Sequence, residues 1–427
     1  MKKRFSLLCV VAMMAALFSV AVSAQDDSLS GELEIFSWWA GDEGPALEAL
    51  IALYNTQNPG VEIINATVTG GSGVNARAVL KTRMLGGDPP DSFQVHAGEE
   101  LTGTWVVADR MVDLTSLYEE NGWFEAFPQD LIDLLTYDGG IYSVPVNIHR
   151  SNVLWYVPAN LEEWGISVPT TWDEFLTTCA TLQDAGVTPL VVGEAWTVNH
   201  LWESVALGVL GADGWNGIWT GDIAPNGPEM IEVFETFNDV LGCTNVNDDA
   251  AGLSWGQATD QMLAGTAAFN VMGDWAAGYM TTTLGLEPGT DYAWSASPGA
   301  DGVFMWLSDS FGLPEGIENV DNTIAWLELL GSVEGQNAFN PLKGSIPARI
   351  DAVAAAPDEY NAYLQSAAED WASNTLVGSL AHGVAANERF MGEFGQVIEI
   401  LRASGSPEAA ANAMTAICFQ AGACGTM

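Results

Sequence analysis

The pattern of apolar and polar positions predicts alternating strands and helices over the first third of the chain. Leu33 and Ile35 alternate with Glu34, as in a half-buried strand. Similar extended segments recur further along, separated by stretches whose apolar residues repeat at helical spacing. We predict strands at residues 33–38, 61–68 and 92–96, and helices at residues 45–54, 75–85 and 105–117. Such alternation indicates an α/β fold with a mostly parallel sheet covered by helices.

The rest of the chain is predicted to be mostly helical. Helices are expected at residues 171–185, 200–210, 230–241, 257–268 and 323–331, with strands at 189–192, 269–272 and 303–307 and a loop at 340–345. Two extended apolar stretches, at residues 141–157 and 303–314, are interpreted as crossings between two lobes. Aromatic and polar residues collect at these crossings, which is typical of a clamp that closes about a hinge. We expect the hinge near residues 146–150 and 307–311.

The amino terminus has the pattern of a secretory signal peptide. Lys2, Lys3 and Arg4 precede an apolar stretch at residues 5–22, and a small-residue cleavage site ends at Ala24. We therefore expect residues 1–24 to be removed and the protein to be periplasmic or extracellular. No other stretch is a run of about 18 uncharged apolar residues, so we expect no further membrane-spanning segment.

The chain is strongly acidic, with 55 Asp and Glu against 12 Lys and Arg and a net charge of −43. Without the predicted signal the balance becomes 9 basic against 55 acidic residues, a net charge of −46. Such a surface repels nucleic acid and anionic lipid, and suits a protein that stays soluble in high salt. Acidic pairs are therefore weak evidence of catalysis. Only Lys81 and Lys343 remain as lysines, so each is a candidate for a specific role.

Four cysteines remain after the signal, and an exported protein permits disulfides between them in three pairings. We favour Cys179 with Cys243 and Cys418 with Cys424. No metal site is expected, because the cysteines lack C-x-x-C spacing and the four histidines are not paired at helical spacing. No cofactor is expected either.

Two short motifs favour a structural interpretation over a catalytic one. Residues 71–76 match a dinucleotide-binding fingerprint, but no suitable acidic residue ends the following strand. Residues 252–256 match a nucleophile elbow, with Asp309 and His382 following in hydrolase order, but no buried strand precedes them. We expect a glycine turn in the first case. In the second, we expect Ser254 to cap a helix. Trp255 is then the residue of this motif that indicates a function.

Two adjacent tryptophans stand at the end of the first predicted strand, where ligands dock in open α/β sheets. Neighbouring strand residues point to opposite faces, so Trp38 and Trp39 cannot both fill one core layer. An indole offers an apolar face and an N–H donor, and Glu43 adds an acceptor nearby. Gln94 and His96 share one face at the end of another strand. The pattern predicts a pocket for a neutral, hydroxyl-rich solute.

Eight segments spread in order along the chain resemble the glucose- and mannose-binding proteins of bacterial ABC sugar importers. They lie at residues 36–43, 75–81 with 88–91, 94–96, 145–150, 270–275, 308–312, 340–345 and 378–382. The resemblance covers residues 31–422. It implies a type II periplasmic-binding-protein-like clamp, in which two α/β lobes close over one monosaccharide. We expect residues 25–146 and 307–350 in the first lobe, and residues 147–306 and 351–427 in the second.

The resemblance also implies which residues touch the sugar. Trp38, Trp39, Glu43, Gln94 and His96 would line the first lobe's side of the cleft. Trp275 and Trp255 would form an aromatic wall opposite. Asp309 would accept hydrogen bonds from sugar hydroxyls, and Lys343 and His382 would donate to them. Some relatives have Lys in place of His96, which bears on the choice between sugars.

The expected protein is a monomeric receptor without catalytic activity. It would capture a monosaccharide, glucose first and mannose or galactose as alternatives, and pass it to the permease subunits of an ABC importer in the membrane. Two other functions remain open: a secreted carbohydrate-active hydrolase using Glu43 and Asp309, and a receptor for oligosaccharides or polyols.

Overall fold

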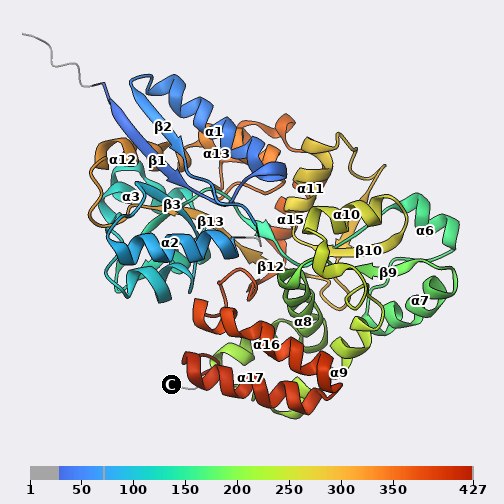
Figure 1. Cartoon of the computed structure of the whole chain (residues 1–427). Coiled ribbons are helices and arrows are strands. Elements are labelled where there is room, and N and C mark those ends of the chain that lie inside the picture. Colours follow the sequence, from blue (N-terminus) through green and yellow to red (C-terminus); the bar gives the residue numbers. More distant parts are fainter. Residues whose placement is uncertain (1–27, 71–72, 426–427) are drawn as a thin grey trace, which may run out of the picture.

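Two β-sheets form the centres of two lobes in the computed structural model, which describes residues 28–70 and 73–425 (Figure 1). The predicted signal peptide, and Gly71 and Ser72 of the fingerprint-like motif, lie outside these residues. A third, three-stranded sheet connects the two lobes. The structure thus has the two-lobed α/β architecture expected from the sequence.

The first lobe is built on a five-stranded sheet with the order β2-β1-β3-β13-β6. Its strands are β1 (Gly31–Phe36), β2 (Val61–Asn65), β3 (Ser92–His96), β6 (Ser143–Pro145) and β13 (Asp309–Gly312). Strand β1 pairs in parallel with β2 and β3, whereas β13 runs antiparallel to both of its neighbours. The sheet is therefore mostly parallel, with one inserted antiparallel strand.

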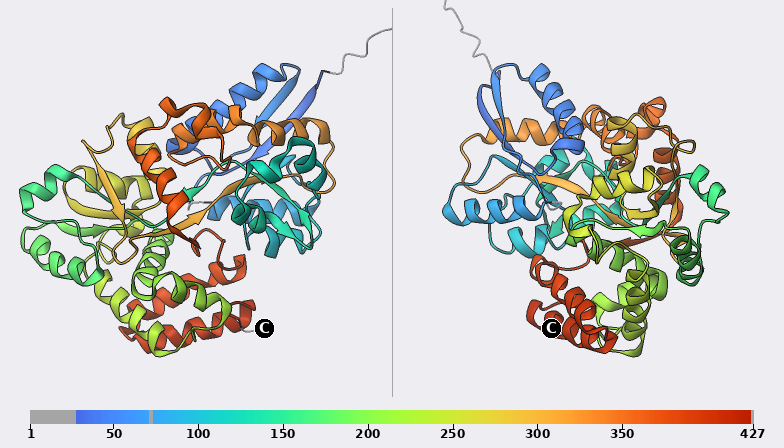
Figure 2. Two further views of the ribbon diagram at one scale, coloured as in Figure 1. Left: turned by 180° about the vertical axis from the view of Figure 1, so that it is seen from behind. Right: turned by 45° about the vertical axis from the view of Figure 1, so that its right-hand side comes forward.

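Helices cover both faces of this sheet (Figures 1 and 2). They are α1 (Gly44–Gln57), α2 (Val74–Gly86), α3 (Thr115–Asn121), α4 (Trp123–Ala126), α5 (Gln129–Leu135), α12 (Val320–Leu330), α13 (Val333–Lys343) and α14 (Ala352–Ala355). A short hairpin of β4 (Thr136–Tyr137) and β5 (Gly140–Ile141) joins them. Helix α1 packs on α13, which brings the C-terminal end of α13 close to the end of β1.

The second lobe is built on a four-stranded sheet with the order β11-β8-β10-β9. Its strands are β8 (Val153–Tyr156), β9 (Thr188–Val191), β10 (Ala267–Met272) and β11 (Ala293–Ala296). Its helices are α6 (Pro158–Trp164), α7 (Trp172–Asp184), α8 (Ala195–Thr220), α9 (Pro228–Leu241), α10 (Trp255–Leu263), α11 (Trp275–Gly278), α15 (Ala362–Ser373), α16 (Glu388–Ser404) and α17 (Pro407–Ala421). The last two pack together and on α8 and α9, at the bottom of the views in Figure 2.

The chain crosses between the lobes through the small sheet β14-β12-β7. Its strands are β7 (His149–Arg150), β12 (Val303–Leu307) and β14 (Thr375–Gly378). Only Ser308 separates β12 from β13, so one stretch of chain passes from this sheet into the five-stranded sheet. These crossings contain the residues at which we expect the hinge.

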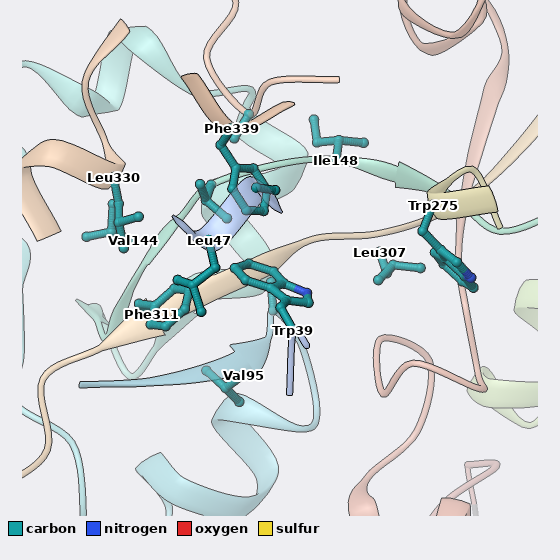
Figure 3. Close-up of a cluster of buried hydrophobic side chains, with 14 of the residues drawn as sticks. Trp39, Leu47, Val95, Val144, Ile148, Trp275, Leu307, Phe311, Leu330 and Phe339 are labelled. Atoms are coloured by element: carbon teal, nitrogen blue, oxygen red, sulfur yellow. The ribbon is translucent and has the colours of Figure 1, made fainter. Parts of the chain in front are cut away.

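Apolar side chains form two buried clusters, one in each lobe and its surroundings. In the first, Trp39 lies beside Phe311 and Phe339, with ring centroids 5.6 Å and 4.7 Å away (Figure 3). Figure 3 also shows Trp275 on the other side of Leu307, facing the same region from the second lobe. The first cluster thus reaches the space between the lobes.

Both favoured disulfides are present: Cys179 to Cys243, and Cys418 to Cys424. The predicted cap is also confirmed, because the Ser254 side chain accepts a hydrogen bond from the backbone N–H of Gln257, whose side chain in turn bonds the Ser254 backbone. Ser254 therefore begins helix α10. No helix of the described residues is both long and apolar enough to cross a bilayer.

Two element predictions were wrong. The helix expected at residues 105–117 is replaced by a short π-helix, Leu101–Val106, followed by irregular chain up to α3. The loop expected at residues 340–345 is instead mostly the last turn of α13, which contains Pro341. The chain leaves that helix only at Gly344, whose φ of 82° is left-handed and favours glycine.

Candidate ligand-binding site

A small cavity of about 20 Å³ lies between the lobes. That volume holds about one water molecule. Nine of the ten predicted site residues line it, and Gln94 does not. The lining consists of Trp38, Trp39, Glu43, His96, His149, Trp255, Trp275, Leu307, Asp309, Lys343 and His382. The structure therefore brings together residues that are up to about 340 positions apart in the sequence, and it shows the lobes closed over this space.

Gln94 lies behind the cavity and holds two parts of its wall in place. Its side chain is buried, and its carbonyl oxygen accepts hydrogen bonds from the Ser37 hydroxyl at 2.7 Å and the Trp38 backbone N–H at 3.2 Å. Its amide nitrogen donates to Asp309 Oδ1 at 2.8 Å. Gln94 thus fixes the tryptophan-bearing end of β1 relative to the start of β13.

Asp309 is a buried carboxylate supported from two sides. Besides the bond from Gln94, its Oδ2 accepts from Asn147 Nδ2 at 2.8 Å, while Asn147 Oδ1 accepts from the Asp309 backbone N–H at 2.8 Å. A carboxylate has about four lone-pair sites, so these contacts leave acceptor capacity. Asp309 is therefore oriented by neutral donors and can still accept hydrogen bonds from a ligand.

His96 is held in a similar way. Its Nδ1 lies 2.7 Å from Glu100 Oε2, and its Nε2 lies 3.6 Å from Asp309 Oδ1. Burial alone would raise the pKa of Glu100, but His96 and Arg77 outweigh it and keep this pKa lowered. The carboxylate therefore fixes the tautomer with hydrogen on Nδ1, and Nε2 is turned toward the cavity.

Lys343 comes from the end of α13 and bridges the two lobes. Its ammonium lies 2.8 Å from Glu43 Oε1, 3.1 Å from His149 Nε2, and about 6 Å from the ring centres of both Trp39 and Trp275. Burial and the neighbouring Lys343 lower the pKa of His149 well below its usual value. His149 is thus neutral, donating through Nδ1 to Asp274 and accepting from Lys343 through Nε2.

His382 faces the cavity with an unpaired nitrogen. Its Nδ1 lies 2.8 Å from the Ser379 hydroxyl, which itself donates to Glu203 at 3.0 Å. The Ser379 hydroxyl thus links the imidazole to the buried carboxyl group of Glu203. Burial lowers the pKa of His382 well below its usual value, so the ring is neutral, and its Nε2 has no hydrogen-bond partner among the described residues.

One group of His and Glu side chains among the described residues lies close enough to hold a metal: His200, Glu203 and His382. Glu203 is fully buried, and it already accepts from the hydroxyls of Ser151 and Ser379 and from two backbone N–H groups. Its oxygens are therefore occupied by hydrogen bonds. The group acts as a support for His382.

Sequence reasoning missed two lining residues, His149 and Leu307, and the residues that orient the others. Asn147, Glu100 and Asp274 touch His96, His149 or Asp309 from behind. His149 could have been found, because it lies in the crossing at residues 145–150 that carries the family resemblance. The supporting residues had no signal of their own, since a buried amide or carboxylate is recognised only by its partners.

The arrangement is suited to binding a polar ring with apolar faces. Trp38 and Trp39 stand on one side, Trp255 and Trp275 on the other, and acceptors and one ammonium lie between them. Trp275 contacts His149 and His382 edge to face or at a tilt, with ring centroids 5.4 Å and 5.0 Å away. The aromatic walls and polar groups therefore form one continuous surface.

Comparisons with known proteins agree with this geometry. The model of the family "Bacterial extracellular solute-binding protein" matches residues 39–337. An ABC-transporter extracellular-binding protein of Pyrococcus horikoshii is 34% identical over 87% of this chain and 84% of its own. A probable sugar-binding periplasmic protein of Rhizobium meliloti is 30% identical over 87% of this chain and 88% of its own.

Among solved structures, the bacterial solute receptor AcbH, described as preferring β-D-galactopyranose, superposes with a TM-score of 0.79. The alignment covers 92% of this chain and 99% of that one, at 16% identity, which indicates a shared fold. The family match over most of the chain and the two relatives at 30% identity or more are specific evidence. The chain belongs to the family of bacterial extracellular solute-binding proteins.

Proposed function

We propose that this protein is a receptor that captures a monosaccharide by closing its two lobes and delivers it to an ABC importer. The observation that carries the proposal is the inter-lobe cavity, in which facing tryptophans enclose Glu43, Asp309, Lys343 and His382. Indole faces suit the C–H groups of a pyranose, and buried polar groups reject solutes that leave them unpaired. The probable sugar-binding relative supports the ligand class.

The position of the site between the lobes explains why a bound sugar would favour the closed form. Each lobe supplies part of the lining, so a sugar contacts all of it only in the closed form and shifts the equilibrium toward that form. Lys343 supports this role, since it belongs to the first lobe and lies near Trp275 of the second. We place the lobe boundaries near residues 146 and 307, and near residue 350.

D-Glucose is the first candidate, with mannose and galactose as alternatives. A neutral, equatorially substituted ring needs both donors and acceptors around its rim. Asp309 and Glu43 would accept, and Lys343 and His382 would donate. We further propose a periplasmic or extracellular location, a monomeric receptor, and permease subunits in the membrane as the partner.

Calorimetric titration of D-glucose into refolded protein tests the proposal. We expect one-to-one binding, and at least about a 30-fold loss of affinity in Trp38→Ala and in Trp275→Ala, because each removes a stacking face worth about 2 kcal/mol. Trp164→Ala is the matched control, since Trp164 ends helix α6 away from the cavity. Unchanged affinity in both site variants would reject this cavity as the binding site.

A hydrolase that uses Glu43 and Asp309 is the competing function. Glu43 is held by Lys343 at 2.8 Å, and Asp309 is held by two amides, so neither is poised as a free acid. We expect prolonged incubation with aryl glycosides to release no aglycone. Release that disappears in Asp309→Asn would favour the enzyme instead.

A further inference from the structure

A second, larger hollow is lined by residues of helix α2 of the first lobe and helix α16 of the second. Figure 1 shows where these two helices lie. We call it the basic groove. Its volume is about 920 Å³, and its lining includes Arg77, Lys81, Arg110 and Arg389. Only nine basic residues follow the predicted signal peptide, against 55 acidic ones, and four of the nine line this groove. Two acidic residues, Glu388 and Glu393, line it as well. Its lining is thus net basic in a strongly acidic protein.

The basic side chains outside the groove are tightly paired. Arg83, Arg150, Arg349 and Arg402 form ion pairs of 2.5 to 2.8 Å with acidic partners, and Lys343 lies 2.8 Å from Glu43. These five have evident structural or site roles.

Three of the basic side chains inside the groove are held loosely. Lys81 and Arg389 approach carboxylates only at 3.7 and 3.6 Å, whereas Arg77 is mostly buried beside Glu100. The side chains of Lys81 and Arg389 are 58% and 60% exposed, and Arg110 is exposed too. Exposed pairs of this kind contribute little stability. These cations are therefore available to bind an anion at small cost.

Aromatic side chains that line the groove lie next to those that line the cavity. Trp196 lines the groove, and its ring lies 6.2 Å from both Trp275 and His382 of the cavity. Its indole N–H is buried without a hydrogen-bond partner. On the opposite lobe, the Arg77 guanidinium lies 5.8 Å over the ring of Trp38. The cavity and the groove are thus separated by contacting aromatic rings.

We propose that the basic groove binds the anionic second unit, a hexuronate, of a saccharide whose neutral first ring occupies the cavity. The inference rests on the proposed function. Arg110 and Arg389 at the exposed part of the groove would bind the carboxylate, since guanidinium groups match its two oxygens. Trp196 would offer its ring face to the second sugar ring.

The test compares two disaccharides that differ in one group. Cellobiouronic acid has a carboxylate where the second glucose of cellobiose has a CH₂OH group. We expect calorimetry in constant salt to show about tenfold or tighter binding of the acid, as a charge-assisted hydrogen bond provides. In the Arg110→Gln, Arg389→Gln double variant, the affinity for the acid should fall to that for cellobiose. The Arg349→Gln, Arg402→Gln double variant removes the same charge outside the groove and should keep the preference.

The outcomes separate this inference from the proposed function. If glucose binds but cellobiouronic acid binds no tighter than cellobiose, the groove inference is overturned and the receptor function stands. A preference for the acid that survives in the groove variant also overturns it. If only cellobiouronic acid binds, the groove inference stands and the monosaccharide assignment fails. If no sugar binds to folded protein, both fail.

Discussion

The residues that touch the cavity depend on a set of buried residues that do not. Gln94, Asn147 and Glu100 fix Asp309 and His96, while Ser379 and Glu203 fix His382. Such supporting bonds set which nitrogen of each imidazole faces a ligand, and with it whether that atom donates or accepts. Replacing a supporting residue should therefore alter selectivity among sugars as well as affinity.

The buried carboxyl group of Glu203 makes the stability of the folded protein depend on pH. Burial raises its pKa to about 7 from the ordinary 4.5, so between these values the folded protein keeps a proton that the unfolded chain has lost. Its contribution to stability is present below pH 4.5 and is lost as the pH rises through about 7. The loss is of order 3 kcal/mol.

The Glu203→Gln variant should not lose stability in this way as the pH rises, because its amide does not titrate. We expect the difference in Tm between parent and variant to shift in the variant's favour when the pH is raised from about 5 to about 8. Thermal unfolding followed by circular dichroism measures it. Glu399→Gln, which changes an exposed carboxylate, is the control and should show no such shift. A parallel pH dependence in parent and Glu203→Gln would contradict the buried-proton explanation.

At the scale of elements, the sequence predicted β1, β2 and β3 of the first lobe, because alternation and short apolar runs mark buried strands. The segments that form β6 and β13 were interpreted only as crossings between the lobes. The end of α13 could not be predicted, since Pro341 normally interrupts a helix by removing a backbone donor. Packing of α13 on α1 outweighs that local preference. The site residues were found through the ends of strands and the family resemblance, whereas their positions relative to one another depend on the crossings and were not readable from local patterns.

The two disulfides should differ in their effect on stability. Cys179–Cys243 closes a loop of 64 residues between α7 and the end of α9, whereas Cys418–Cys424 closes one of 6. Loop-closure entropy predicts losses of about 4 and about 2 kcal/mol. Denaturant titration of the Cys179→Ala, Cys243→Ala and the Cys418→Ala, Cys424→Ala double variants compares them directly. A larger loss from the short loop would show that packing at the C-terminal end of α17 outweighs the entropy of the chain.

At the scale of the whole molecule, the acidic surface links stability to salt. With 55 acidic residues against 9 basic ones after the signal, like charges repel within the folded state, and salt shortens the range of that repulsion. We expect Tm to rise by several degrees from about 0.2 M to about 2 M KCl. Differential scanning calorimetry of the ligand-free protein measures this. A Tm that stays constant over this range would show that surface charge does not limit stability.

The small size of the cavity between the closed lobes implies that opening limits both the rate of ligand capture and the apparent affinity. A space of about 20 Å³ cannot admit a sugar ring, so this conformation must open before anything enters. The apparent dissociation constant then equals the intrinsic one divided by the fraction of molecules that are open. A closed but unloaded receptor would also present the same outer surface to the transporter as a loaded one and occupy it unproductively. Weakening the ion pair between Lys81 of α2 and Glu388 of α16, which joins the two lobes, should therefore speed capture and reduce unproductive binding of the empty receptor to the transporter.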